Sequence, residues 1–118
     1  MSILSEEEYR LLFSESPIGL MIFNADGVLI EANLRVRKLL GLIKPSQFKL
    51  VNLFEDPNIP EQYKSQLNQK MEVHFSAEYD FDKIRNHQIY DTARSGKIYL
   101  DFHIYPFSLR KNSTINGF

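Results

Sequence analysis

The 118-residue sequence contains no cysteine and no tryptophan. Without cysteine the chain can form no disulfide, no thiolate metal site and no cysteine nucleophile, and it fits a reducing compartment. An excess of charge of one sign is also missing, because 14 Lys and Arg residues stand against 15 Asp and Glu residues. The resulting net charge of −1 gives no indication of a nucleic acid or an anionic membrane as a partner.

Long hydrophobic runs are absent as well. The longest, around residues 18–23, is far too short to cross a bilayer. Residues 6–8 are all Glu, where a signal peptide would have a basic and then an apolar stretch. We therefore expect a cytoplasmic protein that does not insert into a membrane, with a length and an apolar fraction of 43% typical of one globular domain.

Known catalytic patterns are missing too. The five glycines are scattered singly, so the chain has no glycine-rich phosphate loop, and no serine lies in a Gly-x-Ser-x-Gly elbow. The pairs Glu55–Asp56 and Asp80–Asp82 are expected in loops or on a wet strand face, where solvated charge is a better interpretation than acid–base chemistry. We predict no catalytic residue in this chain.

Helical signals come first along the chain. Ser5 and Glu8 have the spacing of a capping box, and Leu4 and Tyr9 flank them as a hydrophobic staple would. The helix is expected to end before Pro17, because the residue before a proline is pushed out of helical geometry. One face of this helix is apolar and is formed by Tyr9, Leu12 and Phe13.

A β-hairpin and a short helix should follow. Residues 19–23 and 28–32 are apolar strands, and the segment 24–27 (Asn-Ala-Asp-Gly) between them is typical of a turn. Both faces of these strands are apolar, so the outer face needs cover, for which the first helix is the nearest candidate. Asn33 is placed as a helix N-cap, and Gly41 suits a left-handed C-cap.

The rest of the sequence predicts irregular structure over residues 42–58, a helix from about Pro60, and two strands. The strands, 72–81 and 98–105, alternate strictly between apolar and polar residues, which indicates one face on a core and one facing water. The segment 82–97 between them is expected to be a polar link. This order of elements predicts an α+β domain with an antiparallel sheet.

His74 and His103 fall on the polar faces of these two strands, where a cross-strand pair could meet. A zinc site would need a third ligand, and none is obviously placed. We therefore interpret both as surface histidines and predict no metal site.

The hairpin and the helix after it carry a family resemblance. Residues 23–33 (Phe-Asn-Ala-Asp-Gly-Val-Leu-Ile-Glu-Ala-Asn), followed by a helix that ends in Leu-Leu-Gly, resemble the opening of PAS domains. Residues 16–19 (Ser-Pro-Ile-Gly) resemble the segment that precedes their first strand. Residues 78–82 and 95–101 are similar to the later strands of PAS domains in archaeal sensor kinases with several such domains. The resemblance covers residues 5–118.

This resemblance implies an α+β fold with a nominally five-stranded antiparallel sheet and helices on one face. The chain would be a single sensory domain over residues 1–118, with a flanking helix in 1–16 and the PAS core in 17–118. The family's fifth strand should begin near Ile115, so we expect that strand to be largely missing from a sequence that is a piece of a longer protein. An unpaired edge of this kind favours self-association.

The resemblance also implies a pocket for a small molecule or cofactor between sheet and helices. The flavin-cysteinyl and cysteine-linked chromophore branches are disfavoured because cysteine is absent, and the haem branch because residues 60–70 contain no histidine. The cofactor stays unknown. We predict a pocket lined by inward apolar residues, namely Phe23, Val36, Leu39, Leu40, Phe54, Leu67, Phe75, Tyr79, Leu100, Phe102 and Ile104.

Two functions remain open at this point. The first is a sensory module for signal transduction, the input domain of a histidine kinase in a two-component phosphorelay, with phosphotransfer carried by an output domain outside this chain. The second is a pure dimerisation module whose core is filled by its own side chains. In both cases we predict a homodimer formed through Tyr9, Leu12 and Phe13. A small enzyme is a weaker third hypothesis, because it would need a convergent polar cluster in the core and the sequence indicates none.

Overall fold

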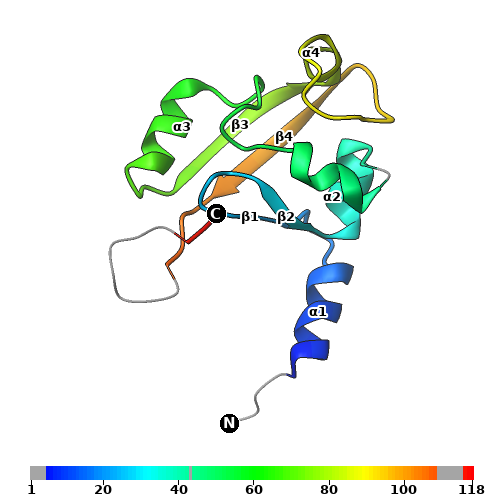
Figure 1. Cartoon of the computed structure of the whole chain (residues 1–118), viewed down its shortest axis with the longest axis vertical. Coiled ribbons are helices and arrows are strands. Elements are labelled where there is room, and N and C mark those ends of the chain that lie inside the picture. The colour runs from blue at the N-terminus through cyan, green and yellow to red at the C-terminus, as the bar shows by residue number, and fades with distance from the viewer. Residues whose placement is uncertain (1–4, 43, 109–115) are drawn as a thin grey trace.

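The structure is a computed structural model that describes residues 5–42, 44–108 and 116–118. Its elements in chain order (Figure 1) are α1 (Glu6–Glu15), β1 (Met21–Phe23), β2 (Leu29–Ala32), α2 (Leu34–Leu40), the 3-10 helix η1 (Pro45–Leu50), α3 (Glu61–Asn68), β3 (Val73–Asp80), α4 (Phe81–Asn86) and β4 (Lys97–Ile104). Within the described residues the strands form two antiparallel pairs, β1–β2 and β3–β4. This arrangement of small antiparallel sheets and helices confirms the predicted α+β class.

Helix α1 has the predicted capping box at its start. The Ser5 hydroxyl accepts a hydrogen bond from the Glu8 backbone N–H at 3.1 Å, and the Glu8 carboxylate accepts one from the Ser5 N–H at 3.2 Å. Leu4, the other half of the predicted staple, lies outside the described residues.

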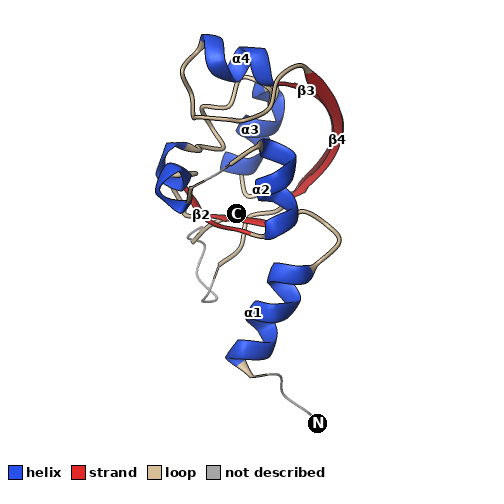
Figure 2. Ribbon diagram, turned by 90° about the vertical axis from the view of Figure 1, so that its right-hand side faces the viewer, coloured by secondary structure: helices blue, strands red, loops and turns tan. Residues whose placement is uncertain are grey.

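The position of α1 differs from the prediction. Figures 1 and 2 show that α1 extends away from the rest of the molecule, and none of its residues is buried. It adjoins α2, so the prediction that α1 covers the outer face of the hairpin is wrong. The physical reason lies at its C-terminal end, where the carbonyl of Phe13 is held by the side chain of Asn33 and the helix joins the domain end-on.

The hairpin turn and the caps of α2 are as predicted. The Asn24 side-chain oxygen accepts hydrogen bonds from the N–H groups of Asp26 and Val28 at 3.0 Å each. Gly27 has a φ of 85° and Gly41, at the C-cap of α2, has a φ of 67°, a region that glycine occupies without steric cost. These local signals fix where β1, β2 and α2 begin and end.

Asn33 does more than cap α2. Its side chain is only 2% exposed, and its oxygen accepts from the N–H groups of Val36 at 3.1 Å and Leu20 at 3.0 Å. Its amide nitrogen donates to the carbonyls of Phe13 at 3.0 Å and Ile18 at 2.9 Å. One side chain therefore connects the end of α1, the segment leading into β1 and the start of α2.

Strands β3 and β4 pair in register from Val73 with Ile104 to Asp80 with Lys97. The side chains alternate as predicted: Val73, Phe75 and Tyr79 are buried, and the residues between them are exposed or half-exposed. Figure 2 shows these strands curving along one side of the molecule, with α2, α3 and α4 on the same face. The predicted inner wall of the core is confirmed.

The link between the strands is not the polar loop that we predicted from residue 82. Strand β3 ends at Asp80, whose carboxylate accepts a hydrogen bond from the Asp82 N–H at 2.9 Å and caps helix α4. Phe81, expected in the strand, begins α4, and both Phe81 and Ile84 are fully buried. Phe81 and Ile84 are three positions apart, and residues with this spacing lie on the same face of a helix. A helical conformation therefore lets both side chains face the interior.

Candidate functional site

A cavity of about 550 Å³ lies between β1, α2 and β4. Most of its lining is apolar and comes from residues 18–23, from α2 and from β4. Pockets for small ligands in proteins measure about 300–1,000 Å³ and combine such a lining with a few polar groups. The size and character of this cavity suit a ligand of that kind.

Most of the predicted pocket residues border this cavity, namely Phe23, Val36, Leu39, Leu40, Tyr79, Leu100, Phe102 and Ile104. The remaining three, Phe54, Leu67 and Phe75, do not border it. Leu67 is fully buried within the core, and the ring of Phe75 stacks on Tyr63 with centroids 4.1 Å apart. Phe54 meets Phe118 edge to face at 5.4 Å. These three side chains fill space between elements. The sequence shows only that a residue faces inward, and an inward side chain can either fill the core or line a cavity.

One side of the cavity is bordered by strand edges. Phe118 and Phe23 exchange two backbone hydrogen bonds of 2.8 and 2.9 Å, and Gly117 forms antiparallel bridges to Asn24 and Phe107. Residues 116–118 therefore lie between β1 and the segment after β4, and they follow the point in the sequence at which we expected a fifth strand to begin. Ile115, where that strand was expected to begin, lies outside the described residues.

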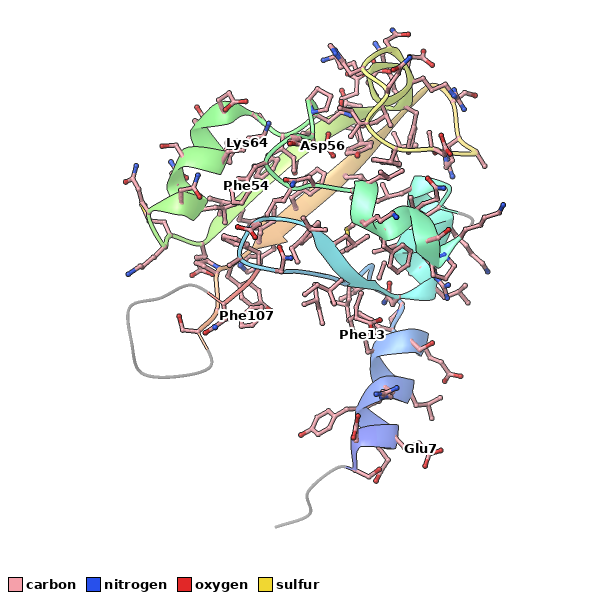
Figure 3. The ribbon with its side chains drawn as sticks, in the orientation of Figure 1. Glu7, Phe13, Phe54, Asp56, Lys64 and Phe107 are labelled. Carbon is pink, nitrogen blue, oxygen red and sulfur yellow. The ribbon has the colours of Figure 1, made fainter. Side chains whose placement is uncertain are left out.

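The cavity also has a polar side, where Asp56 and Tyr79 border it and Tyr90 lies behind them. Asp56 is 7% exposed and borders the cavity together with Tyr79. The Tyr79 hydroxyl donates to Asp56 Oδ2 at 2.5 Å, and the Tyr90 hydroxyl lies 2.8 Å from that of Tyr79. The Asn58 backbone N–H donates to Asp56 Oδ1 at 2.9 Å. In Figure 3, Asp56 lies in the segment that crosses in front of β3 and β4, with Lys64 nearby on α3.

Burial dominates the electrostatics of this cluster. It raises the pKa of the Asp56 carboxyl, against the opposing effect of the hydrogen bonds from Tyr79 and Asn58 and of the Lys64 charge. Burial and the neighbouring Asp56 also raise the pKa values of the Tyr79 and Tyr90 hydroxyls, so both tyrosines stay protonated and can donate. Lys64 is 6% exposed, and its Nζ contacts the Glu61 carboxylate at 3.2 Å.

This cluster corrects two interpretations of the sequence. Asp56 is not a solvated charge, and the core does contain a convergent polar cluster. Both errors have one cause, because the two hydroxyls of the cluster stand far along the chain: Tyr79 bonds Asp56, and Tyr90 bonds Tyr79. One sequence signal was available: a tyrosine on the inward face of a strand, such as Tyr79, needs a hydrogen-bond partner when it is buried.

His74 and His103 meet across β3 and β4 as predicted, with ring centroids 5.1 Å apart. Each is also paired with a carboxylate: His74 Nε2 lies 3.0 Å from Asp101, and His103 Nε2 lies 3.1 Å from Glu72. The hydrogen bond from His74 lowers the pKa of Asp101. Among the described residues, no group of three or more His, Cys, Asp or Glu side chains is arranged so that it could hold a metal ion.

The residues predicted for the dimer interface are separated by the structure. Tyr9 and Leu12 are 58% and 59% exposed on α1, whereas Phe13 is half-buried and borders the cavity.

In the part of the chain that the structure describes, no helix is long and apolar enough to span a membrane.

Comparison with known proteins identifies the family. A family model described as a PAS domain matches residues 7–75, which is more than half of the chain. No curated protein matches the sequence. The matched region contains α1, the hairpin, Asn33, α2, Asp56 and α3. PAS domains are non-catalytic modules for sensing, signalling or interaction, and this chain belongs to the PAS domain family.

Proposed function

We propose that this PAS domain is a sensory module that binds a small ligand in the cavity between β1, α2 and β4. The observation that carries the proposal is a cavity of about 550 Å³ with apolar walls and a polar group, Asp56, at its border. The space opens to solvent beside exposed residues such as Ile18 and Tyr105, so a small molecule could enter it. Its volume and mainly apolar lining are those of small-ligand pockets, which favours a ligand over a pure interaction module.

The resemblance of residues 78–82 and 95–101 to archaeal sensor kinases supports a place in a cytoplasmic histidine kinase, as an input domain. The signal would leave through α1. Phe13 borders the cavity, and its carbonyl is bound by Asn33, which also caps α2. A ligand that prefers one arrangement of these elements would shift the population of α1 positions and bias an attached output domain.

The test uses 1-naphthalenemethanol, a neutral bicyclic probe, titrated into the protein and followed by backbone amide NMR shifts. We expect saturable shifts at cavity residues. Leu39→Trp should block binding because Leu39 borders the cavity, whereas Leu50→Trp should not, because Leu50 is exposed and does not border it. Absence of saturable binding to the folded wild-type protein, or equal binding by both variants, would contradict ligand binding in this cavity.

A second candidate function is homodimerisation, which is favoured by the exposed apolar side chains Tyr9, Leu11 and Leu12 on a helix that stands away from the domain. A second copy of α1 could cover them and remove this surface from water. We expect concentration-dependent association in sedimentation experiments, and its loss when Tyr9 and Leu12 are both replaced by Asp. Ser14→Asp on the same helix is the control. A monomer at every concentration would refute this function.

A further inference from the structure

The Asp56 cluster has hydrogen-bonding capacity that the fold itself leaves unused. The proton of the Tyr79 hydroxyl goes to Asp56 Oδ2. The contact between the two tyrosines must therefore use the proton of Tyr90, so both donors are consumed within the cluster. The carboxylate has about four lone-pair sites. It accepts from the Asn58 N–H and from Tyr79, and the Asn58 side chain adds a third interaction, so capacity for about one more donor is left. What remains is acceptor capacity, and a ligand here must be a donor.

The charges around Asp56 point the same way. Among the described residues Asp56 forms no ion pair. The nearby cation, Lys64, is engaged by the Glu61 carboxylate. An ionised Asp56 is therefore a buried charge that is hydrogen-bonded but not paired with a cation, which is costly. A cationic donor would remove that cost, whereas a second carboxylate would add to it.

We propose that Asp56 binds the ammonium group of an amine ligand whose apolar part occupies the cavity. This inference rests on the proposed ligand-binding function and adds the chemical class of the ligand. The ammonium group would donate to the remaining lone-pair site of Asp56, and the apolar part would lie against β1, α2 and β4.

The fold holds the Asp56 side chain in place beside the cavity. The loop that carries Asp56 is tied to β3 twice: the Tyr79 hydroxyl donates to the Asp56 carboxylate, and the Asn58 side chain donates to the Asp80 carbonyl and accepts from the Asp80 N–H, both at 3.0 Å. The connection through Asn58 does not depend on the side chain of Asp56, so it remains when Asp56 is substituted. Asp56 is therefore held by its neighbours and borders the cavity.

The groups that face Asp56 also give the inference a pH dependence. They are Tyr79 from β3, Tyr90 from the segment after α4, and Lys64 from α3. Lys64 is itself paired with the Glu61 carboxylate on the same helix. The tyrosines stay neutral, so Asp56 is the group that titrates as the pH rises from acid to neutral. Because burial raises the pKa of Asp56, the affinity for an ammonium ligand should rise with pH through that pKa, and binding should lower the pKa.

The experiment compares three probes that share a naphthalene ring: 1-naphthylmethylamine as the cation, 1-naphthalenemethanol as the neutral probe and 1-naphthoate as the anion. We expect the amine to bind at least about tenfold more tightly than the alcohol, as a charge-assisted hydrogen bond would give. Asp56→Asn should bring the amine down to the affinity of the alcohol and leave the alcohol unchanged. Asp26→Asn is the matched control, because Asp26 is exposed and does not border the cavity.

A measurement on the wild-type protein keeps the test decisive if Asp56→Asn fails to fold. The carboxyl carbon of Asp56, followed by NMR, should titrate at lower pH with the amine bound and at an unchanged pH with the alcohol bound. Equal affinities for amine and alcohol, tighter binding of the naphthoate, or an unmoved Asp56 titration would overturn the amine inference and leave the ligand-binding function standing. Failure of both amine and alcohol to bind the folded protein would instead refute the proposed function.

Discussion

Replacing Asn33 by Asp should destabilise this domain strongly, although the two side chains have the same shape. The new carboxylate could still accept from the N–H groups of Leu20 and Val36. It would lose both donated hydrogen bonds and would place a negatively charged oxygen about 3 Å from the carbonyls of Phe13 and Ile18. Leaving one buried polar group unsatisfied costs about 1–3 kcal/mol, so the two carbonyls together account for about 2–6 kcal/mol at neutral pH.

Two further substitutions separate the contributions of this side chain. Asn33→Ser keeps a cap acceptor, whereas Asn33→Ala also removes the cap, which is worth about 0.5–2 kcal/mol. We expect Ala to be more destabilising than Ser by about that amount. The Asp variant should recover part of its stability at acid pH, where a protonated carboxyl can donate to one carbonyl, and the Ala variant should not.

Urea unfolding followed by far-UV circular dichroism measures these differences at neutral and acid pH. Asn68→Asp is the control, because Asn68 is an exposed residue at the end of α3 and should change the free energy of unfolding by no more than about 0.5 kcal/mol. Domains of this size are stable by only about 5–15 kcal/mol, so the predicted losses are easily measured. An Asp variant as stable as the wild type at neutral pH would refute the role given to the amide nitrogen of Asn33.

Four other predictions concern stability, its pH dependence and metal binding. Phe75→Ala should cost about 3–5 kcal/mol in urea unfolding, because this buried ring packs between two aromatic neighbours, and a cost below about 1 kcal/mol would be inconsistent with that packing. His103→Ala should change stability by no more than about 0.5 kcal/mol, and stoichiometric zinc that disappears in this variant would contradict a purely surface role. Burial raises the pKa of Asp56, so the stabilising contribution of its carboxyl is present at low pH and is lost as the pH rises through the folded-state pKa. The Asp56→Asn variant should therefore gain stability relative to the wild type as the pH rises from about 4 to 7. A stability difference that stays constant over this range would refute the assignment. The pKa of Asp101 is lowered by His74, so its contribution has the opposite sign and should be lost as the pH falls through the folded-state pKa.

The sequence by itself determined the features that depend on neighbours a few residues away. The capping box at Ser5, the N-cap at Asn33 and the left-handed cap at Gly41 were all readable, because each acts within one helical turn. The strict alternation in β3 and β4 was readable for a similar reason, since successive side chains on a strand point to opposite faces.

Only the tertiary structure decided where α1 lies, which inward residues border the cavity, and what Asp56 does. Helix α1 has an apolar face in sequence, yet its position is set by bonds from Asn33, twenty residues from Phe13. Phe75 and Phe102 face the same core, but only Phe102 borders the cavity.

Asp56 shows the physical reason most clearly. Its pKa depends most on how much water the folded chain removes, and then on the Tyr79 hydroxyl, which stands 23 residues away. Burial and long-range partners are properties of the assembled chain, so a local pattern can indicate which residues face inward but not which of them meet.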